Sequence, residues 1–409
     1  MKTTLITFIL SIIWTACSAP QRENESTSNE SVSFIESPAG ENASLPYLVT
    51  GEDGNLYFSW VEKKDSNWVE LKYSIMKDDS WSEPQLIAKG NDWFVNWADY
   101  PMLAVDKDGN MISNFLAKST SGTYSYDVNI VYKPADGEWS DPIIPHKDGT
   151  PTEHGFVTML PKNDGRFLLS WLDGRNTGGG DHGSEDGHVG GGAMTIRTAA
   201  LDMQGNLTEE AELDNRVCDC CQTGGAMTAS GPVIAYRDRS EEEIRDISFV
   251  KLVNQKWSEP QTVNTDNWEI AGCPVNGPRM TSSGSTIAIA WFSAAEGNPK
   301  VNIAFSDDDG SFKEPIIVDD TKPLGRVDII LLDEETAVVS WLDNEGTPAI
   351  KYKTIKSDGT STEPMILSET SDSRGSGFPQ MTIVDGTTYF AWTSYDKEKG
   401  TEVKMAKLF

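Results

Sequence analysis

The chain of 409 residues has little positive charge and few cysteines, and it lacks long hydrophobic segments. Its 34 Lys and Arg stand against 63 Asp and Glu, which gives a formal net charge of −29. A phosphate backbone would repel such a chain, so nucleic acid is excluded as an expected partner. No segment after residue 16 approaches the ~20 apolar residues of a membrane-spanning helix. We expect a soluble body.

Helical periodicity is also missing from the sequence. Short apolar runs alternate with turns rich in Gly, Asp and Asn, and this pattern predicts strands. The 13 Trp, 14 Phe and 11 Tyr provide enough apolar surface for a large core. The composition therefore predicts an all-β globular protein.

The first residues have the features of an export signal. Lys2 precedes an apolar run over residues 5–14, and Trp14-Thr15-Ala16-Cys17 resembles the bacterial lipobox. We expect a lipoprotein signal peptide over 1–16, lipidation of Cys17 and a disordered tether over 17–30. Ordinary cleavage after Ala19 is the alternative. We expect the protein in the bacterial cell envelope, attached to the outer membrane. Its lipid anchor would be its only contact with the membrane, and we expect a monomer.

Two internal repeats predict the fold. A Trp-Ser-x-Pro motif recurs at Trp81, Trp139 and Trp257, with weaker copies near 312 and 361. Apolar strands that close on an aromatic residue recur about 50 to 65 residues apart, close to the period of a four-stranded propeller blade. These aromatic residues are Trp60, Phe115, Trp171, Tyr236, Trp291, Trp341 and Trp392.

The repeat count favours a single seven-bladed β-propeller over residues 31–409, with six blades as the alternative. Six fourth strands are recognisable for seven aromatic-closed strands, and the last unit ends without one. We predict that the N-terminal segment beginning at Val32 supplies the missing strand and closes the last blade.

The segment from Ser306 to Phe312 looks like the Asp-box (BNR) turn of the sialidase superfamily, and the whole body resembles sialidase-like propellers. That resemblance implies three arginines that hold a substrate carboxylate, a Tyr/Glu nucleophile pair and an Asp acid/base. Ser44-Leu45-Pro46 stands where the family has its first arginine. Arg237, Arg279 and Arg326 are therefore the expected replacement triad.

The chemically reactive segments fall on one predicted face, where the innermost strands of a propeller begin and the loops after the second strands return. The expected catalytic residues are Asp99, Glu153, His154 and Asp238. The expected substrate-binding residues are Arg175, Arg237, Asn276, Arg279, Arg326 and Asp328. Guanidinium groups bind carboxylate and sulfate in forked geometry. The alternative for each arginine is an ion pair with an adjacent aspartate.

Four further cysteines, Cys218, Cys220, Cys221 and Cys273, lie in predicted blades 4 and 5. In an oxidising compartment we expect Cys273 to form a disulfide with one of the other three. Free thiols, or a copper or zinc site that also uses histidines, are the alternatives. The glycine-rich segment 178–192 is either a lid or a solvated loop.

Three functions remain open at this point. The first is an exported sialidase-like glycoside hydrolase that acts on an acidic oligosaccharide or small anionic ligand, without a cofactor. The second is a propeller that binds such a ligand without turnover, because the fold alone does not decide activity. The third is a Cys/His metal-binding envelope protein.

Overall fold

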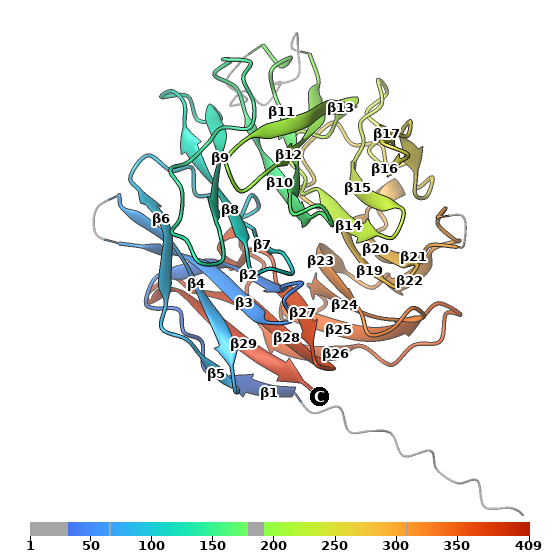
Figure 1. Ribbon diagram of the computed structural model, residues 1–409. Coiled ribbons are helices and arrows are strands. Elements are labelled where there is room, and N and C mark those ends of the chain that lie inside the picture. The colour runs from blue at the N-terminus through green and yellow to red at the C-terminus, as the bar shows by residue number, and fades with distance from the viewer. Residues whose placement is uncertain (1–31, 65–66, 179–191, 308–309) are drawn as a thin grey trace, which may run out of the picture. The chain divides into compact units, whose positions relative to one another are not determined.

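The computed structural model describes residues 32–64, 67–178, 192–307 and 310–409, which form seven antiparallel sheets arranged as a ring (Figure 1). The seven-bladed propeller predicted from the repeats is confirmed, and the six-bladed alternative is wrong. The predicted signal peptide, Cys17, the tether and most of segment 178–192 lie outside the described residues.

Blades 1 to 3 use consecutive strands. Blade 1 has β2 (Ala43–Thr50), β3 (Leu56–Lys63), β4 (Val69–Lys77), β5 (Ser80–Trp81) and β6 (Gln85–Gly90). Blade 2 has β7 (Leu103–Val105), β8 (Met111–Lys118) and β9 (Tyr126–Lys133), and its predicted outer strand is reduced to a bridge between Ile130 and Ile143. Blade 3 has β10 (His154–Pro161), β11 (Phe167–Asp173), β12 (Met194–Leu201) and β13 (Leu207–Val217).

Blades 4 to 7 complete the ring. Blade 4 has β14 (Gly224–Thr228), β15 (Gly231–Arg237), β16 (Ile247–Val253), β17 (Lys256–Trp257) and β18 (Gln261–Thr262). Blade 5 has β19 (Arg279–Ser283), β20 (Thr286–Ser293), β21 (Lys300–Phe305) and β22 (Ile316–Asp319). Blade 6 has β23 (Pro323–Leu331), β24 (Thr336–Asp343), β25 (Ala349–Lys356) and β26 (Met365–Glu369). Blade 7 has β27 (Gln380–Val384), β28 (Thr387–Asp396), β29 (Gly400–Leu408) and β1 (Val32–Ile35).

Two short 3-10 turns, η1 (Ala295–Gly297) and η2 (Arg374–Ser376), are the helical segments of the described residues. No helix in this part of the chain has the length and apolar character needed to cross a membrane.

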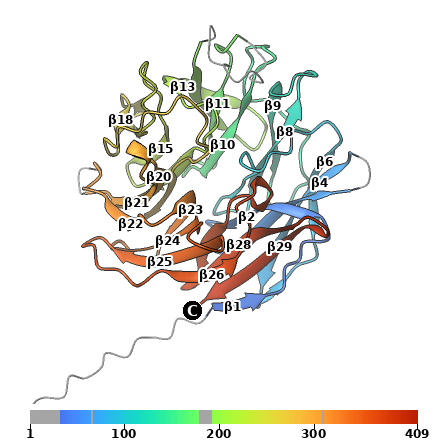
Figure 2. The ribbon, with the colours of Figure 1, turned by 180° about the vertical axis from the view of Figure 1, so that it is seen from behind.

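The ring is closed by pairing the two ends of the propeller. β1 runs antiparallel to β29, with Val32 opposite Leu408 and Ile35 opposite Met405. Figures 1 and 2 show the blue strand β1 beside the red strand β29 from both sides. The predicted closure by the N-terminal strand is confirmed.

The repeated aromatic residues form the packing between blades, and all seven are buried. Several of the indoles also have their N–H groups satisfied by a carboxylate. Trp60 Nε1 donates to Glu62 Oε1 at 2.8 Å, and Trp341 Nε1 donates to Asp319 Oδ2 at 2.6 Å. A large ring can be buried at little cost when its polar group keeps a partner.

The serine of the Trp-Ser-x-Pro motif holds the outer edge of a blade. In blade 1, Ser82 N–H donates to the carbonyl of Ile75 at 2.9 Å, and Ile75 N–H donates to Ser82 Oγ at 3.0 Å. The same exchange joins Ser140 to Tyr132 and Ser258 to Lys251, and Ser306, outside this motif, exchanges hydrogen bonds with Ile287 in the same way. The repeat is therefore structural.

A chain that begins at Glu36 should be less stable than a chain that begins at Val32. Removing β1 leaves the outer edge of β29 unpaired and takes Phe34 from the ring of Trp392. Because each lost hydrogen bond contributes about 1 kcal/mol, we expect a loss of about 2–4 kcal/mol in the free energy of unfolding. Urea denaturation of the two chains measures this difference, and equal midpoints would contradict closure by β1.

Candidate functional site

The residues singled out from the sequence gather around segment 96–100, which precedes β7 and contacts the inner ends of several blades. Gln222 Nε2, before β14, donates to the carbonyl of Ala98 at 2.7 Å. The Trp97 ring stacks on Phe378 of blade 7 at 5.6 Å, and the Arg326 guanidinium of blade 6 lies 4.7 Å from the same Trp97 ring. The inner ends of blades 4, 6 and 7 thus meet this segment. We call this region the mouth.

Three innermost strands begin with the same backbone irregularity. β2, β10 and β23 each have a register shift near the start, where Leu45, Phe156 and Arg326 adopt φ values of 53°, 53° and 52°. The backbone N–H groups of these three residues each donate a hydrogen bond to a side chain of the preceding blade. The acceptors are Thr393, Asp99 and Asn276, respectively. The strain of each bulge is thus offset by a contact that joins two blades.

Asp99 is the acceptor at the bulge of blade 3. Both carboxylate oxygens lie 2.9 Å from Phe156 N, and the residue is 4% exposed. Burial raises the pKa of Asp99 to about 7, against the lowering effect of the Phe156 N–H. A Cβ at Gly155 would lie 2.0 Å from Asp99 Oδ2, so only glycine fits there. Asp99 also lines a small internal cavity together with Arg279.

Glu153 forms the second perturbed carboxyl group at the mouth. Tyr126 OH donates to Glu153 Oε1, and the backbones of the two residues form a parallel bridge. Burial raises the pKa of Glu153 well above its ordinary value, and the nearby charges of Asp99 and Asp219 add to the effect. Glu153 is 9% exposed. Its environment therefore favours the protonated form of the carboxyl group.

Arg279 is the predicted substrate-binding arginine whose side chain lines the cavity. Its Nε donates to Asp328 Oδ1 at 2.9 Å, while Nη1 and Nη2 reach Tyr100 OH at 3.3 Å and Gln380 Oε1 at 3.4 Å. Asp328 also accepts hydrogen bonds from the backbone N–H groups of Ile329 and Met381. Asp328 therefore fixes the orientation of Arg279.

The predicted triad of Arg237, Arg279 and Arg326 does not form one anion pocket. Arg237 is fully buried and donates to the carbonyls of Asn276, Phe292 and Arg245. Arg326 donates to the carbonyls of residues 372, 373 and 377. The physical reason is that carbonyls at strand ends lack ladder partners, and guanidinium groups supply the missing donors.

The other predicted site residues also have protein partners. Asn276 contributes its carbonyl to Arg237 and its side-chain oxygen to Arg326 N–H, so it joins three blades. Arg175 forms a forked ion pair with Asp173, with both distances 2.7 Å. Asp238 accepts from Ser248 Oγ at 2.9 Å, and burial raises its pKa. His154 packs with residues of blades 2 and 3, described below.

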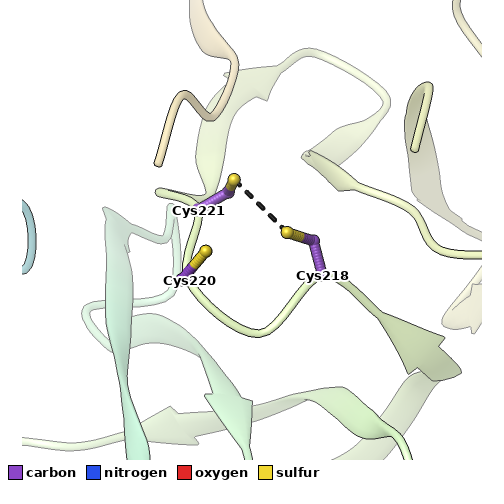
Figure 3. A group of neighbouring side chains, drawn as sticks. All are labelled: Cys218, Cys220 and Cys221. Carbon is purple, nitrogen blue, oxygen red and sulfur yellow. Dashed lines mark hydrogen bonds between the residues drawn. The ribbon is translucent and has the colours of Figure 1, made fainter. Parts of the chain in front are cut away.

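The four cysteines lie together between blades 4 and 5, and all four are free thiols in the structure. Figure 3 shows Cys218, Cys220 and Cys221 on one loop, with 3.4 Å between the sulfurs of Cys218 and Cys221. Cys273 contacts Cys220. The bridge predicted from Cys273 to blade 4 is thus not formed here, although its partner is correctly placed.

Cys218 has a strongly perturbed thiol. Burial acts to raise the pKa of Cys218, but hydrogen bonds from Cys220 and Cys221 and the charge of Arg245 lower it well below its ordinary value. Arg245 Nη1 lies 3.2 Å from Cys218 Sγ. A thiolate beside an arginine is the form that reacts in thiol–disulfide exchange and that binds metals.

Sequence reasoning missed three residues near the mouth: Tyr126, Asp127 and Asp148. Tyr126 and Asp127 open β9 next to Glu153 and His154, and Asp148 lies between His146 and His154 in sequence. The one signal in the sequence was the pair of histidines that flanks Asp148. Nothing local marks a tyrosine at a strand start as the partner of a glutamate on the next blade.

No protein-family model matches this chain, and no curated protein sequence does. Several solved structures share its fold. One is a protein of unknown function from Dyadobacter fermentans, 14% identical over 92% of this chain and 97% of that chain, with a TM-score of 0.53. Another is the BP39L lectin from Burkholderia pseudomallei, 9% identical over 90% and 96% of the two chains, with a TM-score of 0.61.

A third similar structure is an ulvan lyase of a polysaccharide lyase family, bound to -[GlcA(1-4)Rha3S]-; it is 11% identical over 91% and 95% of the two chains, with a TM-score of 0.54. The NanB sialidase from Streptococcus pneumoniae is also similar, at 12% identity over 90% and 68% and a TM-score of 0.45. At these identities the likeness to the first three structures establishes the propeller fold alone.

The change Arg237→Met should destabilise the protein strongly. It leaves the buried carbonyls of Asn276, Phe292 and Arg245 without donors, and each such group costs about 1–3 kcal/mol. We expect a loss of at least about 3 kcal/mol in the free energy of unfolding. Arg166→Met, which removes partly exposed ion pairs at the blade 3 turn, is the matched control and should cost about 1 kcal/mol or less. Similar small losses for both variants would favour a ligand-binding role for Arg237.

Free thiols of the unfolded, unreduced protein should number at most two among Cys218, Cys220, Cys221 and Cys273. The sulfurs of Cys218 and Cys221 already lie 3.4 Å apart, and Cys273 contacts Cys220, so oxidation requires small movements. Titration with a chromogenic disulfide reagent counts the thiols. Four free thiols after aerobic isolation from the envelope would contradict the predicted disulfide.

Proposed function

We propose that this protein binds an acidic glycan at the mouth of its propeller and hydrolyses a glycosidic bond, with Glu153 as the proton donor. The observation that carries this proposal is the pair of mouth carboxyl groups with raised pKa values, Asp99 and Glu153. A carboxyl group that keeps its proton near neutral pH can protonate the leaving oxygen of a sugar. In a glycoside hydrolase one carboxyl group donates this proton, and a second, ionised carboxylate activates the attacking water or attacks the sugar itself.

Each residue has a defined role in this proposal. Glu153 donates the proton, and Tyr126 holds its carboxyl group in place through their hydrogen bond. Asp99, with a pKa of about 7, is the second carboxyl group, and its ionised form takes the proton of the attacking water. Arg279 lines the same small cavity as Asp99, and its outer nitrogens contact Tyr100 OH at 3.3 Å and Gln380 Oε1 at 3.4 Å. We assign these nitrogens as the cationic donors for an acidic sugar.

The solved relatives support a carbohydrate ligand. The BP39L protein is a lectin, and the ulvan lyase is bound to a saccharide that contains a uronic acid and a sulfated rhamnose. Both ligand groups of the latter are anions, which is the class that Arg279 fits. The expected partner of this chain is therefore a uronic or sulfated oligosaccharide.

Binding without turnover is the second candidate, and the burial of the mouth favours it. Asp99 and Glu153 are 4% and 9% exposed, and Asp99 also joins blade 2 to blade 3. A proton donor must reach the glycosidic oxygen. The same set of variants separates the two candidates.

Glu153→Gln should abolish hydrolysis and preserve ligand binding, because glutamine keeps the shape of the side chain and loses the proton. A panel of uronic and sulfated oligosaccharides is screened for release of reducing ends and, in parallel, by calorimetry. Asp164→Asn, which changes an exposed carboxylate at the blade 3 turn, is the control and should leave both measurements unchanged. Ligand binding with no hydrolysis by the parent would favour the lectin-like function, and no binding of any acidic saccharide would contradict both candidates.

We also propose that the protein is exported and anchored in the bacterial envelope through a lipid on Cys17. The support is the lipobox-like Trp14-Thr15-Ala16-Cys17 after an apolar run. In cells fed an alkyne fatty acid, the parent should be labelled and found in the membrane fraction. Cys17→Ser should be unlabelled, and equal labelling of the two chains would contradict this assignment.

A further inference from the structure

Two buried histidines stack on each other between blades 2 and 3. His146 lies in the segment after blade 2, and His154 opens β10. Their ring centroids are 3.7 Å apart, and the planes differ by 6°. His154 is 0% exposed. Neither ring is used by the mechanism proposed above.

Asp127 faces one nitrogen of each ring. Its Oδ1 lies 3.8 Å from His146 Nε2 and 3.6 Å from His154 Nδ1, so neither contact is a hydrogen bond. Ligands about 2.1 Å from a common zinc ion at tetrahedral angles are about 3.4 Å apart, so these separations are close to those of a ligand set.

Asp148 faces the opposite nitrogens of the same rings. Its Oδ2 lies 3.3 Å from His146 Nδ1 and 3.3 Å from His154 Nε2. Metal-binding histidines commonly direct their second nitrogen toward a carboxylate, which fixes the tautomer of the ring. Thr150 bonds the other oxygen of Asp148 through its backbone N–H at 2.9 Å and holds the carboxylate in place.

The polar atoms of this cluster are left unpartnered. Among the described residues, His146 Nε2, both nitrogens of His154 and Asp148 Oδ2 are buried without a hydrogen-bond partner. Each such atom costs about 1–3 kcal/mol, so four together require an explanation. Asp173, by contrast, is saturated by Arg175 and by Trp171 Nε1.

The charge of the cluster also calls for a cation. Asp127, Asp148 and Asp173 carry three negative charges, and Arg175 supplies one positive charge. Arg175 lies on the side of Asp148 and Asp173, 3.5 Å from Asp148 Oδ2, and would repel a cation there. The position beside Asp127 is free of that repulsion, and Asp127 is partly exposed with a side chain 21% accessible.

We propose that His146 Nε2, His154 Nδ1 and Asp127 Oδ1 bind one divalent transition-metal ion, with Zn²⁺ as the expected ion. The three ligand atoms all lie within 4.8 Å of one another. Two imidazoles and one carboxylate suit zinc, whereas calcium and magnesium prefer oxygen ligands alone. The stacked rings are nearly parallel, so binding requires both to turn out of the stack until the two nitrogens converge on one ion. Asp148 lies beside the opposite nitrogens.

The metal position is separate from the proposed proton donor. Tyr126 pairs with Glu153 across the bridge, and Asp127 and His154 are the next residue on each strand. Successive side chains of a strand point to opposite faces, so the ion and the Tyr126–Glu153 pair lie on opposite faces of the same bridge. The ion would brace the junction of blades 2 and 3 whatever the ligand at the mouth.

The test is metal binding by the mature protein after treatment with a chelator. We expect the parent to take up one Zn²⁺ per chain, measured by competition with a chromogenic chelator. His146→Ala and Asp127→Asn should each weaken Zn²⁺ binding more than tenfold, since loss of mere supporting contacts already costs 10–100-fold. The thermal midpoint of the parent, and not of the variants, should rise with added Zn²⁺.

The control variant is Asp164→Asn, which removes an exposed carboxylate at the blade 3 turn and should leave Zn²⁺ binding unchanged. Co²⁺ identifies the ligands, because thiolates give an intense near-ultraviolet charge-transfer band that imidazoles and carboxylates lack. We expect the Co²⁺ spectrum of the parent to lack this band, and we expect Cys220→Ser to give the same spectrum as the parent. Absence of binding by the parent, unchanged binding by His146→Ala, or a thiolate band that Cys220→Ser removes would each overturn the proposal. Asp127→Asn keeps the test valid if His146→Ala fails to fold.

Discussion

The pairing of β1 with β29 is the interaction on which the remaining structure depends. It joins the two ends of the propeller and fixes seven blades around one axis. Closure brings the starts of the innermost strands together, where backbone groups have no neighbour in a ladder. The mouth must therefore be rich in polar side chains, and segment 96–100 with its partners from four blades meets this requirement.

The architecture could be predicted from the sequence because it rests on repeated, local requirements. An aromatic residue such as Trp341 needs a buried position with a partner for its N–H, and the serine of Trp-Ser-x-Pro needs a third-strand neighbour. A buried aromatic residue recurs in all seven blades, so its spacing gives the blade count, and the serine motif recurs in three of them. The missing fourth strand predicted the closure at Val32.

The roles of the polar residues could not be predicted in the same way. A guanidinium group satisfies a backbone carbonyl as well as a ligand anion, and the sequence around Arg237 and Arg326 does not distinguish the two. The same holds for Asn276, which links blades through both backbone and side chain. The roles of Tyr126 and Asp127 depend on their neighbours Glu153 and His154, which belong to the next blade. These contacts join residues that are distant in the sequence, so local sequence patterns do not predict them.

The proposed proton donor depends on raised pKa values of two buried carboxyl groups at the mouth, Asp99 and Glu153. Titration of carboxyl-¹³C resonances, assigned with Asp99→Asn and Glu153→Gln, measures this directly. We expect Asp99 to titrate with a pKa of about 7, and Glu153 to titrate with a pKa well above the ordinary value of a glutamate. If both groups titrate near 4, as exposed carboxyl groups do, neither is protonated at neutral pH, and the proposed proton donor is contradicted.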